Sequence, residues 1–175
     1  MPTVPVTVDD IIYHTAMVAR GLTHAFLMAD MPFMSYTTPE QALVNAVRLM
    51  QEGGSMMVKL EGNEGQLRVV EYLAKHDIPV CAHLGLKPQS VHKIGGFKVQ
   101  GRDNAIAKQM AQDAKTLQSA GADIILLECV PNEVGQNITK LVDVPVIGIG
   151  AGPHVDGQIL VLYDELGITQ GRLPR

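Results

Sequence analysis

Short apolar runs alternate with amphipathic segments along most of this sequence, and this alternation limits the possible folds more than any other feature. Each run is rich in β-branched or aliphatic residues and is bounded by glycine or proline, which is typical of a buried parallel strand. The segments between the runs have helical spacing. We predict strands at 25–30, 56–62, 79–85, 123–130 and 145–152, whereas the run at 159–168 fits either a strand or a helix.

The predicted helices have recognisable ends. Thr7 and Asp10 open a helix that stops at Gly21. Residues 38–41, Thr-Pro-Glu-Gln, form a capping box with proline at the first helical position, and a pair of glycines closes that helix at 53–54. Helical spacing with weaker caps recurs at 64–76, 105–119 and 132–142. Strand–helix alternation of this kind predicts an α/β fold with right-handed crossovers.

Two α/β architectures compete, an open doubly wound sheet and a (β/α)8 TIM barrel. A dinucleotide-binding sheet carries G-x-G-x-x-G after its first strand, but the glycine cluster at 148–152 follows a late strand and has other spacing. That cluster fits a phosphate cradle and tight packing at a strand end equally well. Polar residues recur at the C-terminal ends of the predicted strands, where barrel enzymes place catalytic groups, and this favours the barrel. A complete barrel needs eight strands and about 250 residues, so we expect an incomplete one.

Composition indicates one compact domain, which we assign to residues 1–175 as a single partial TIM barrel. The chain is 46% hydrophobic and 18% charged, with a net charge of −4 and no Lys/Arg run, so we expect no nucleic-acid partner. No stretch reaches the roughly 18 apolar residues of a membrane span, and the N-terminal segment lacks a signal-peptide pattern. Cys81 and Cys129 lie in apolar runs, and we predict buried free thiols.

Strand periodicity brings the candidate functional side chains together. Lys59 and Glu61 are two residues apart and leave the same face of their strand. A small barrel is filled with apolar side chains, so charges at strand ends should point into its mouth. Asp30, Glu61 and Glu128 should then converge from three strands around one pocket, beside Lys59, with His83 at the end of a fourth strand.

Carboxylates from separate strands suit a hard cation such as Mg²⁺. A 2-keto acid chelates such an ion through its carboxylate and keto oxygens, and the ion then stabilises the enolate formed when the neighbouring carbon loses a proton. A carboxylate whose pKa is raised by burial could act as the base, and Lys59 could pair with the substrate carboxylate. Each acidic residue alone is more often a helix cap or a structural ion pair than a functional group, and a lone histidine is more often structural. Glu128 is as easily functional as structural, because it lies in an otherwise apolar run where an uncompensated carboxylate is costly. From spacing alone the prediction stops at a metal-dependent barrel enzyme.

At these same positions the sequence resembles the ketopantoate hydroxymethyltransferase family of the phosphoenolpyruvate mutase/isocitrate lyase superfamily. The resemblance rests on unusual segments that span nearly the whole chain: PVTVDDIIYHTAMVARG, LMADMPFMSYTTPEQA, MVKLEG, PVCAHLGLKPQSV, GGFKVQGR, LLECVP and PVIGIGAGPHVDGQILV. It implies a cytoplasmic, Mg²⁺-dependent enzyme of pantothenate synthesis. The expected reaction transfers a one-carbon unit from 5,10-methylenetetrahydrofolate to 3-methyl-2-oxobutanoate and gives 2-dehydropantoate. The family typically assembles as a homodecamer.

The resemblance also implies residue roles. Asp30 corresponds to a contact with both metal and substrate, Glu61 to a metal ligand and Glu128 to the catalytic proton acceptor. Lys59 corresponds to a substrate contact, and we group His83 with it as a substrate-binding residue in the active-site mouth. The segment GGFKVQGR (95–102) matches a loop near the site.

The chain also departs from the family pattern. Family members carry two further strand–helix units before the segment PVTV, and the second of those strands ends in an Asp-Ser pair that holds metal and substrate. They also continue beyond GRLPR. We therefore expect a truncated form whose own activity is in doubt. One alternative is an inactive remnant that serves as an assembly partner of an intact paralogue, and another is a related C–C or C–P lyase.

Overall fold

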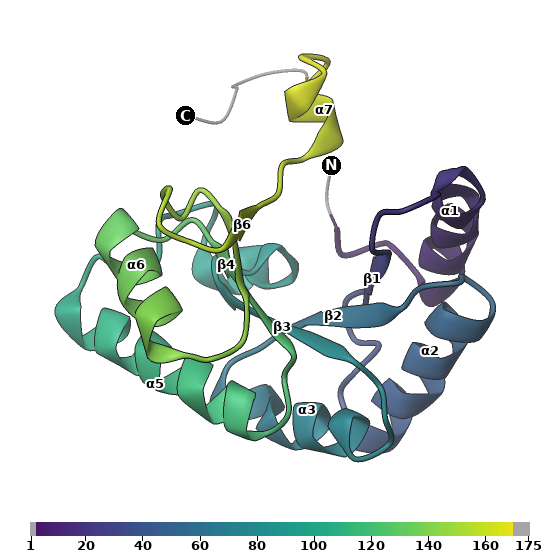
Figure 1. The fold of residues 1–175 in the computed structure, drawn as a ribbon, viewed down its shortest axis with the longest axis horizontal. Helices are drawn as coiled ribbons and strands as arrows, with labels where there is room; N and C mark the ends of the chain where they lie inside the picture. The colour runs from purple at the N-terminus through teal and green to yellow at the C-terminus, as the bar shows by residue number, and fades with distance from the viewer. Residues whose placement is uncertain (1–2, 170–175) are drawn as a thin grey trace.

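The protein folds around one curled sheet of six parallel strands. The structure is a computed structural model, and it describes residues 3–169. The strands pair in the order of the sequence, each parallel to the next (Figure 1). They are β1 (Met28–Asp30), β2 (Met57–Glu61), β3 (Val80–Gly85), β4 (Ile124–Glu128), β5 (Val146–Ile149) and β6 (Gly157–Gln158). The predicted α/β class is confirmed, and the curved sheet is compatible with part of a barrel.

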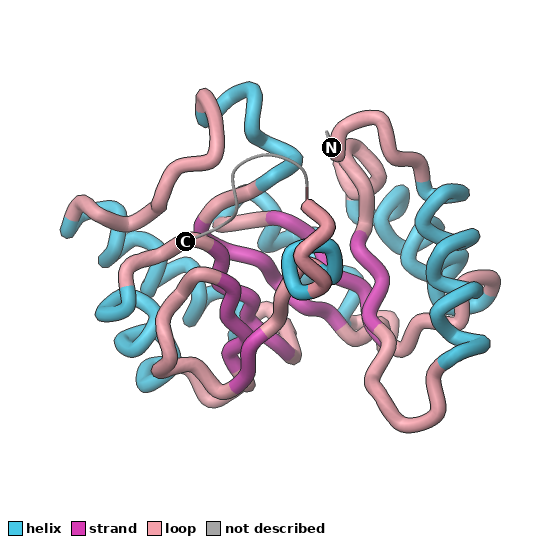
Figure 2. The backbone as a smooth tube through the Cα atoms, turned by 90° about the horizontal axis from the view of Figure 1, so that it is seen from above, coloured by secondary structure: helices cyan, strands magenta, loops and turns pink. Residues whose placement is uncertain are grey.

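Helices cover the convex face of the sheet, as Figure 2 shows from above. The longer ones are α1 (Val8–Gly21), α2 (Pro39–Gln51), α3 (Leu67–Ala74), α5 (Asn104–Ser119) and α6 (Asn132–Leu141). Shorter turns follow the strands: η1 (Glu64–Gln66), η2 (Pro88–Ser90), α4 (Val91–Ile94) and α7 (Leu162–Glu165). Among the described residues, no helix is both long and apolar enough to cross a membrane.

The two faces of the sheet bury different residues because side chains alternate along each strand. Residues of the convex face, such as Val58, Leu60 and Ile125, belong to the main core beneath the helices. The concave face has a small apolar floor of its own, formed by Met57, Cys81 and Leu126. Ionisable residues stand above this floor, as the strand spacing predicted.

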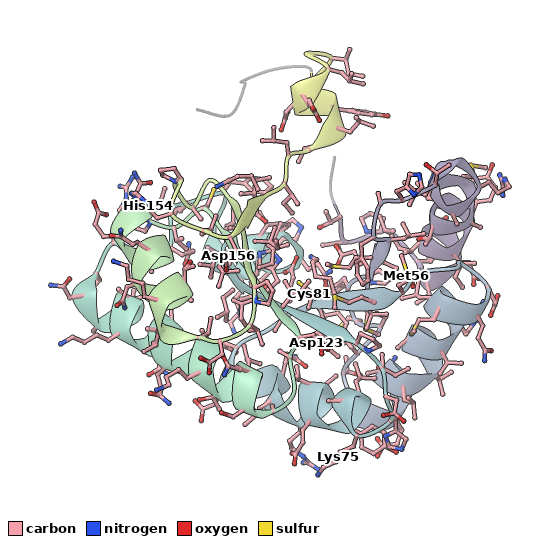
Figure 3. All side chains as sticks on the ribbon, viewed as in Figure 1. Met56, Lys75, Cys81, Asp123, His154 and Asp156 are labelled. Atoms are coloured by element: carbon pink, nitrogen blue, oxygen red, sulfur yellow. The ribbon has the colours of Figure 1, made fainter. Side chains whose placement is uncertain are left out.

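Two aspartate side chains bind the N-terminal ends of strands β3 and β5. Asp123 accepts a hydrogen bond from the Val80 N–H at 2.9 Å, and Asp156 accepts one from the Val146 N–H at 2.8 Å. Both aspartates are labelled in Figure 3. These side chains supply partners for the first backbone donors of β3 and β5, which would otherwise be left without one.

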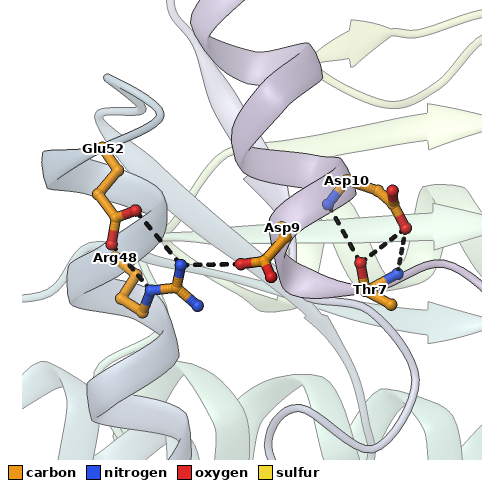
Figure 4. A network of polar contacts seen from close by, with 5 residues as sticks. All are labelled: Thr7, Asp9, Asp10, Arg48 and Glu52. Atoms are coloured by element: carbon orange, nitrogen blue, oxygen red, sulfur yellow. Dashed lines mark hydrogen bonds and ion pairs between the residues drawn. The ribbon is translucent and has the colours of Figure 1, made fainter.

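The N-terminal helix is tied to its neighbour by a polar network (Figure 4). Thr7 and Asp10 form the predicted cap as a complete capping box. In the same turn of α1, Asp9 contacts Arg48 of α2, which also contacts Glu52, both at 2.8 Å. This exposed network orients α1 on α2, although each surface ion pair contributes little by itself.

The capping box predicted at 38–41 is only half formed. Thr38 accepts a hydrogen bond from the Gln41 N–H, as expected. The Gln41 side chain reaches one residue further back and accepts from the N–H and hydroxyl of Thr37. The Gln41 side chain thus caps Thr37 instead of Thr38, because Thr37 offers its hydroxyl as a donor in addition to its N–H.

The C-terminal run at 159–168, which fitted either a strand or a helix, is helical over a short part of its length. The structure places the last strand before it, at Gly157–Gln158, and forms only the four-residue helix α7 within it. This segment projects from the sheet in Figure 1, and its apolar side chains are exposed.

Cys129 is also less buried than predicted, whereas Cys81 is buried and both are free thiols.

Candidate active site

The register of the sheet places the five predicted site residues on the concave face. Asp30 pairs with Lys59 across β1 and β2, and Glu61 pairs with His83 across β2 and β3. Glu128 lies one layer further along, opposite Gly85. All five side chains therefore leave the same face within three successive layers of a parallel sheet.

Lys59 links two of the other site residues. Its Nζ lies 2.9 Å from Asp30 Oδ1 and 3.3 Å from His83 Nδ1. The other ring nitrogen of His83, Nε2, lies 3.4 Å from Glu128 Oε2. A continuous line of ionisable groups thus runs across four strands, from Asp30 to Glu128, with Lys59 and His83 between them.

Glu61 is held by a network that the strand spacing did not predict. Its side chain is 5% exposed, and both carboxylate oxygens accept from the Gln89 N–H at 3.1 Å. The Gln89 side chain donates to the Met31 carbonyl and accepts from the Tyr36 hydroxyl. The loops after β1 and β3 are therefore joined to each other and to the end of β2 around the Glu61 carboxylate.

Gln89 and Tyr36 were missed because their partners lie far away in the sequence. The available signal was the position of Gln89 just beyond the C-terminal end of β3, where barrel enzymes place functional groups. A cavity of about 170 Å³ opens beside Glu61 in these loops. Its lining includes Phe33, Met34, Tyr36, Asn63, Gln66 and Lys87.

The backbone after Glu128 is tightly confined. Gly85 has φ +93°, and a Cβ at this position would lie 2.2 Å from the Glu128 carbonyl oxygen. Cys129 adopts φ +50° immediately after Glu128, and its carbonyl accepts from the Gln100 N–H at 2.8 Å. This contact brings the segment 95–102 against the end of β4, beside the predicted base.

The glycine cluster at 148–152 is explained by packing. A Cβ on Gly148 would lie 2.9 Å from Val155 Cγ2, and one on Gly152 would lie 2.5 Å from Asn132 Oδ1. Gly150 and Gly152 also have positive φ. Of the two interpretations, the structure favours close approach of neighbouring side chains over a phosphate cradle.

Burial dominates the electrostatics of the site. Desolvation raises the pKa of Glu61 to about 7 and that of Glu128 to about 6, although Lys59 opposes both shifts. The pKa of Asp30 is also raised by desolvation against the opposing charge of Lys59. Desolvation and then Lys59 lower the pKa of His83 to about 3, so this ring is neutral near neutral pH.

The donor set fits a hard divalent cation. Burial raises the pKa of all three carboxyl groups, Lys59 opposes each rise, and a bound dication would oppose it further. Asp30 and Glu61 supply the oxygen ligands that Mg²⁺ prefers, and one or two carboxylates are its usual protein ligands. Within residues 3–169, no three His, Cys, Asp or Glu side chains are grouped closely enough to form a complete metal cage.

Sequence comparison decides the family. The signature of the family described as ketopantoate hydroxymethyltransferase matches residues 1–175. The chain belongs to the ketopantoate hydroxymethyltransferase family. Family membership confirms the resemblance found in the sequence.

Curated relatives carry the name 3-methyl-2-oxobutanoate hydroxymethyltransferase. The relative from Alkalilimnicola ehrlichii is 60% identical over 173 residues, which are 99% of this chain and 62% of the relative. The relative from Halorhodospira halophila is 59% identical over 96% of this chain and 61% of its own length. The relative from Nitrosococcus oceani is 56% identical over 98% of this chain and 65% of its own length. The chain thus spans a little under two thirds of these hydroxymethyltransferases.

A solved structure supports the fold. A protein from Burkholderia cenocepacia described as a lyase/mutase superposes with a TM-score of 0.61 at 16% identity. The match covers 82% of this chain and 52% of that protein. At this identity the likeness concerns the fold alone, an α/β arrangement shared by this hydroxymethyltransferase family and a lyase/mutase.

Proposed function

We propose that this chain carries the catalytic rim of a magnesium-dependent 3-methyl-2-oxobutanoate hydroxymethyltransferase. The observation that supports this most is the cluster of Asp30, Lys59, Glu61 and Glu128 on one face of a parallel sheet. In the proposed reaction, 3-methyl-2-oxobutanoate, 5,10-methylenetetrahydrofolate and water give 2-dehydropantoate and tetrahydrofolate. The names of the curated relatives support this substrate.

Asp30 and Glu61 would hold the magnesium ion. When bound, the ion supplies Lewis acidity that makes the carbon next to the keto group more acidic. Glu61 suits this role because the Gln89 N–H fixes its carboxylate and burial keeps bulk water away from it. Asp30 contributes the second carboxylate from the neighbouring strand.

Lys59 would bind the carboxylate of the keto acid. Its side chain is only 13% exposed, so the ammonium group acts in surroundings where charges interact more strongly than in water. Its contact with Asp30 fixes the ammonium at the level of the proposed metal ligands. A carboxylate that approaches Lys59 is thereby directed towards the same rim.

Glu128 would remove the proton from C3 of the keto acid. A base is most effective when its pKa lies near the working pH, and the pKa of Glu128 is raised to about 6. The C–H electron pair would form the bond from C3 to the one-carbon unit as that unit leaves the two folate nitrogens. Water would supply its hydroxyl group, and the proton from C3 and the second proton of water would end on those nitrogens, which returns Glu128 to its carboxylate form. The apolar floor of Met57, Cys81 and Leu126 closes the lower side of the site against water.

Larger features of the family belong to the same proposal. We propose that the curled sheet is part of a (β/α)8 barrel, that the protein is cytoplasmic, and that it works as a homo-oligomer of the family's decameric type. Methylenetetrahydrofolate would approach over the strand ends, where the loops and the segment 95–102 surround the rim. We expect neither a nucleic-acid nor a membrane partner.

The test is product formation by the purified chain. The chain is incubated with Mg²⁺, 3-methyl-2-oxobutanoate and methylenetetrahydrofolate, and 2-dehydropantoate is measured by mass spectrometry. We expect product that requires the folate and is lost in Glu61→Ala, with the exposed Glu165→Gln as a matched control. Unchanged turnover in Glu61→Ala, or conversion of the keto acid to another product without folate, would refute the assignment. A chain that makes no product and instead associates with a full-length relative would support the assembly-partner alternative.

A further inference from the structure

His83 is the most buried member of the candidate site. Its side chain is 1% exposed, which leaves little surface for contact with a substrate. Nδ1 lies 3.3 Å from Lys59 Nζ, and Nε2 lies 3.4 Å from Glu128 Oε2. Nε2 has less than 1 Å² of exposed surface and no hydrogen-bond partner. A buried polar atom without a partner is unfavourable and requires an explanation.

The contact with Lys59 determines where the ring proton lies. An ammonium group can only donate hydrogen bonds, so His83 Nδ1 must accept and cannot carry a proton. A neutral imidazole then carries its single proton on Nε2. Burial and the adjacent Lys59 both disfavour a second ring proton. Nε2 is therefore a donor, and it lies 3.4 Å from the Glu128 carboxylate.

We propose that His83 is a positioning residue, which Lys59 holds in the Nε2–H tautomer and which donates that hydrogen to Glu128. In this arrangement His83 fixes the orientation of the carboxylate and does not touch the substrate. The assignment replaces the substrate contact expected from the sequence. The tautomer follows from geometry alone, and only its effect on turnover rests on the proposed function of Glu128.

The backbone around Glu128 is confined, so only the Glu128 side chain can move closer to His83. The carbonyl of Glu128 is packed against Gly85 and accepts from the Leu86 N–H at 2.8 Å, and the next residue, Cys129, has a fixed positive φ. A rotation of the carboxylate is thus the movement that can close the 3.4 Å separation into a hydrogen bond. The backbone of Leu86 opposes the lowering of the His83 pKa, but Lys59 is the hydrogen-bond partner that the ring has in the structure.

The first experiment determines the tautomer by NMR. Protein with ¹⁵N-labelled histidine is prepared, and the His83 signals are assigned by their loss in His83→Gln. We expect Nδ1 to show the chemical shift of an unprotonated ring nitrogen and Nε2 that of a protonated one. In Lys59→Met this preference should weaken, and in Glu128→Ala the Nε2 proton should shift and exchange faster with water. A proton on Nδ1, or an Nε2 signal that Glu128→Ala leaves unchanged, would overturn the proposal.

The second experiment separates positioning from substrate contact. Exchange of the C3 proton of 3-methyl-2-oxobutanoate is measured with Mg²⁺ for His83→Leu and His83→Gln. Loss of one hydrogen bond to a charged group should lower kcat about 10- to 100-fold in His83→Leu with little change in KM. His83→Gln, whose amide can donate, should recover part of that loss. A raised KM with unchanged kcat would indicate that His83 contacts the substrate directly, and it would contradict the proposal that His83 positions Glu128.

The two experiments also separate this inference from the proposed function. A chain that does not catalyse exchange at all counts against the proposed function, and the tautomer spectra still decide the role of His83. Circular dichroism shows whether each variant folds. If His83→Leu does not fold, the NMR comparison of Glu128→Ala with the parent chain decides the question.

Discussion

Replacing Glu61 by glutamine should make the protein less sensitive to alkaline pH. Glu61 is 5% exposed, and burial raises its pKa from 4.5 to about 7. The folded state therefore binds more protons than the unfolded state between these two values. By linkage, stability must fall as the pH rises through this interval and stay reduced above it. Glutamine is neutral at every pH and removes this dependence.

The size of the effect follows from the shift. A difference of about 2.5 pKa units at about 1.4 kcal/mol per unit corresponds to about 3–4 kcal/mol for the full shift. At pH 8 Glu61→Gln should therefore be up to about 3 kcal/mol more stable relative to the parent chain than it is at pH 4.5. Glutamine keeps one oxygen that can accept from the Gln89 N–H, so the network around Gln89 is retained. Glu128 remains, with its pKa raised to about 6, and leaves a smaller dependence of the same sign.

Urea unfolding at several pH values measures this difference. The chain contains no tryptophan, so circular dichroism is the suitable signal. The exposed Glu165→Gln is the matched control and should follow the parent chain. If the free energies of unfolding of Glu61→Gln and of the parent chain change in parallel between pH 4.5 and pH 8, burial does not hold the Glu61 carboxyl group at a raised pKa and the reasoning is wrong.

Three further predictions concern the same site and its supports. Gly85→Ala should destabilise the protein by about 2–4 kcal/mol in urea, because φ is +93° and the new Cβ would meet the Glu128 carbonyl oxygen at 2.2 Å; an unchanged midpoint would contradict the close packing at β4. Asp156→Ala should cost about 1 kcal/mol by the same assay, because the Val146 N–H loses its acceptor; no loss would show that water replaces it. Mg²⁺ at about 100 times its Kd should stabilise the parent chain at pH 8 by about 3 kcal/mol. Mg²⁺ should stabilise Glu61→Gln far less than the parent chain. Equal stabilisation of both proteins would show that the ion binds at another place.

The sequence predicted the concave face well because that face depends on local rules. Side chains alternate along a strand, and polar residues at the C-terminal ends of parallel strands meet at one edge. These two rules were sufficient to bring together Asp30, Lys59, Glu61 and Glu128. The sheet keeps the strands in sequence order, as consecutive parallel strands with helical crossovers tend to be neighbours.

Features that depend on distant contacts could not be predicted in this way. Gln89 binds Tyr36 across 53 residues and Glu61 across 28 residues, and no spacing within one segment indicates either contact. The predicted strand at 145–152 ends early, at Ile149, because Gly150 turns into a positive φ. In the C-terminal run, apolar residues alone could not distinguish strand from helix, and only Leu162–Glu165 became helical.

Proton exchange at C3 of 3-methyl-2-oxobutanoate tests the central claim most directly. In D₂O with Mg²⁺, removal of the C3 proton turns the methyl doublet in the ¹H NMR spectrum into a singlet, and no folate is needed. If the side chains on the concave face bind the keto acid and Glu128 takes its proton, the chain will catalyse this change and Glu128→Gln will abolish it. Exchange no faster than in buffer, or equal exchange by Glu128→Gln, would contradict the account.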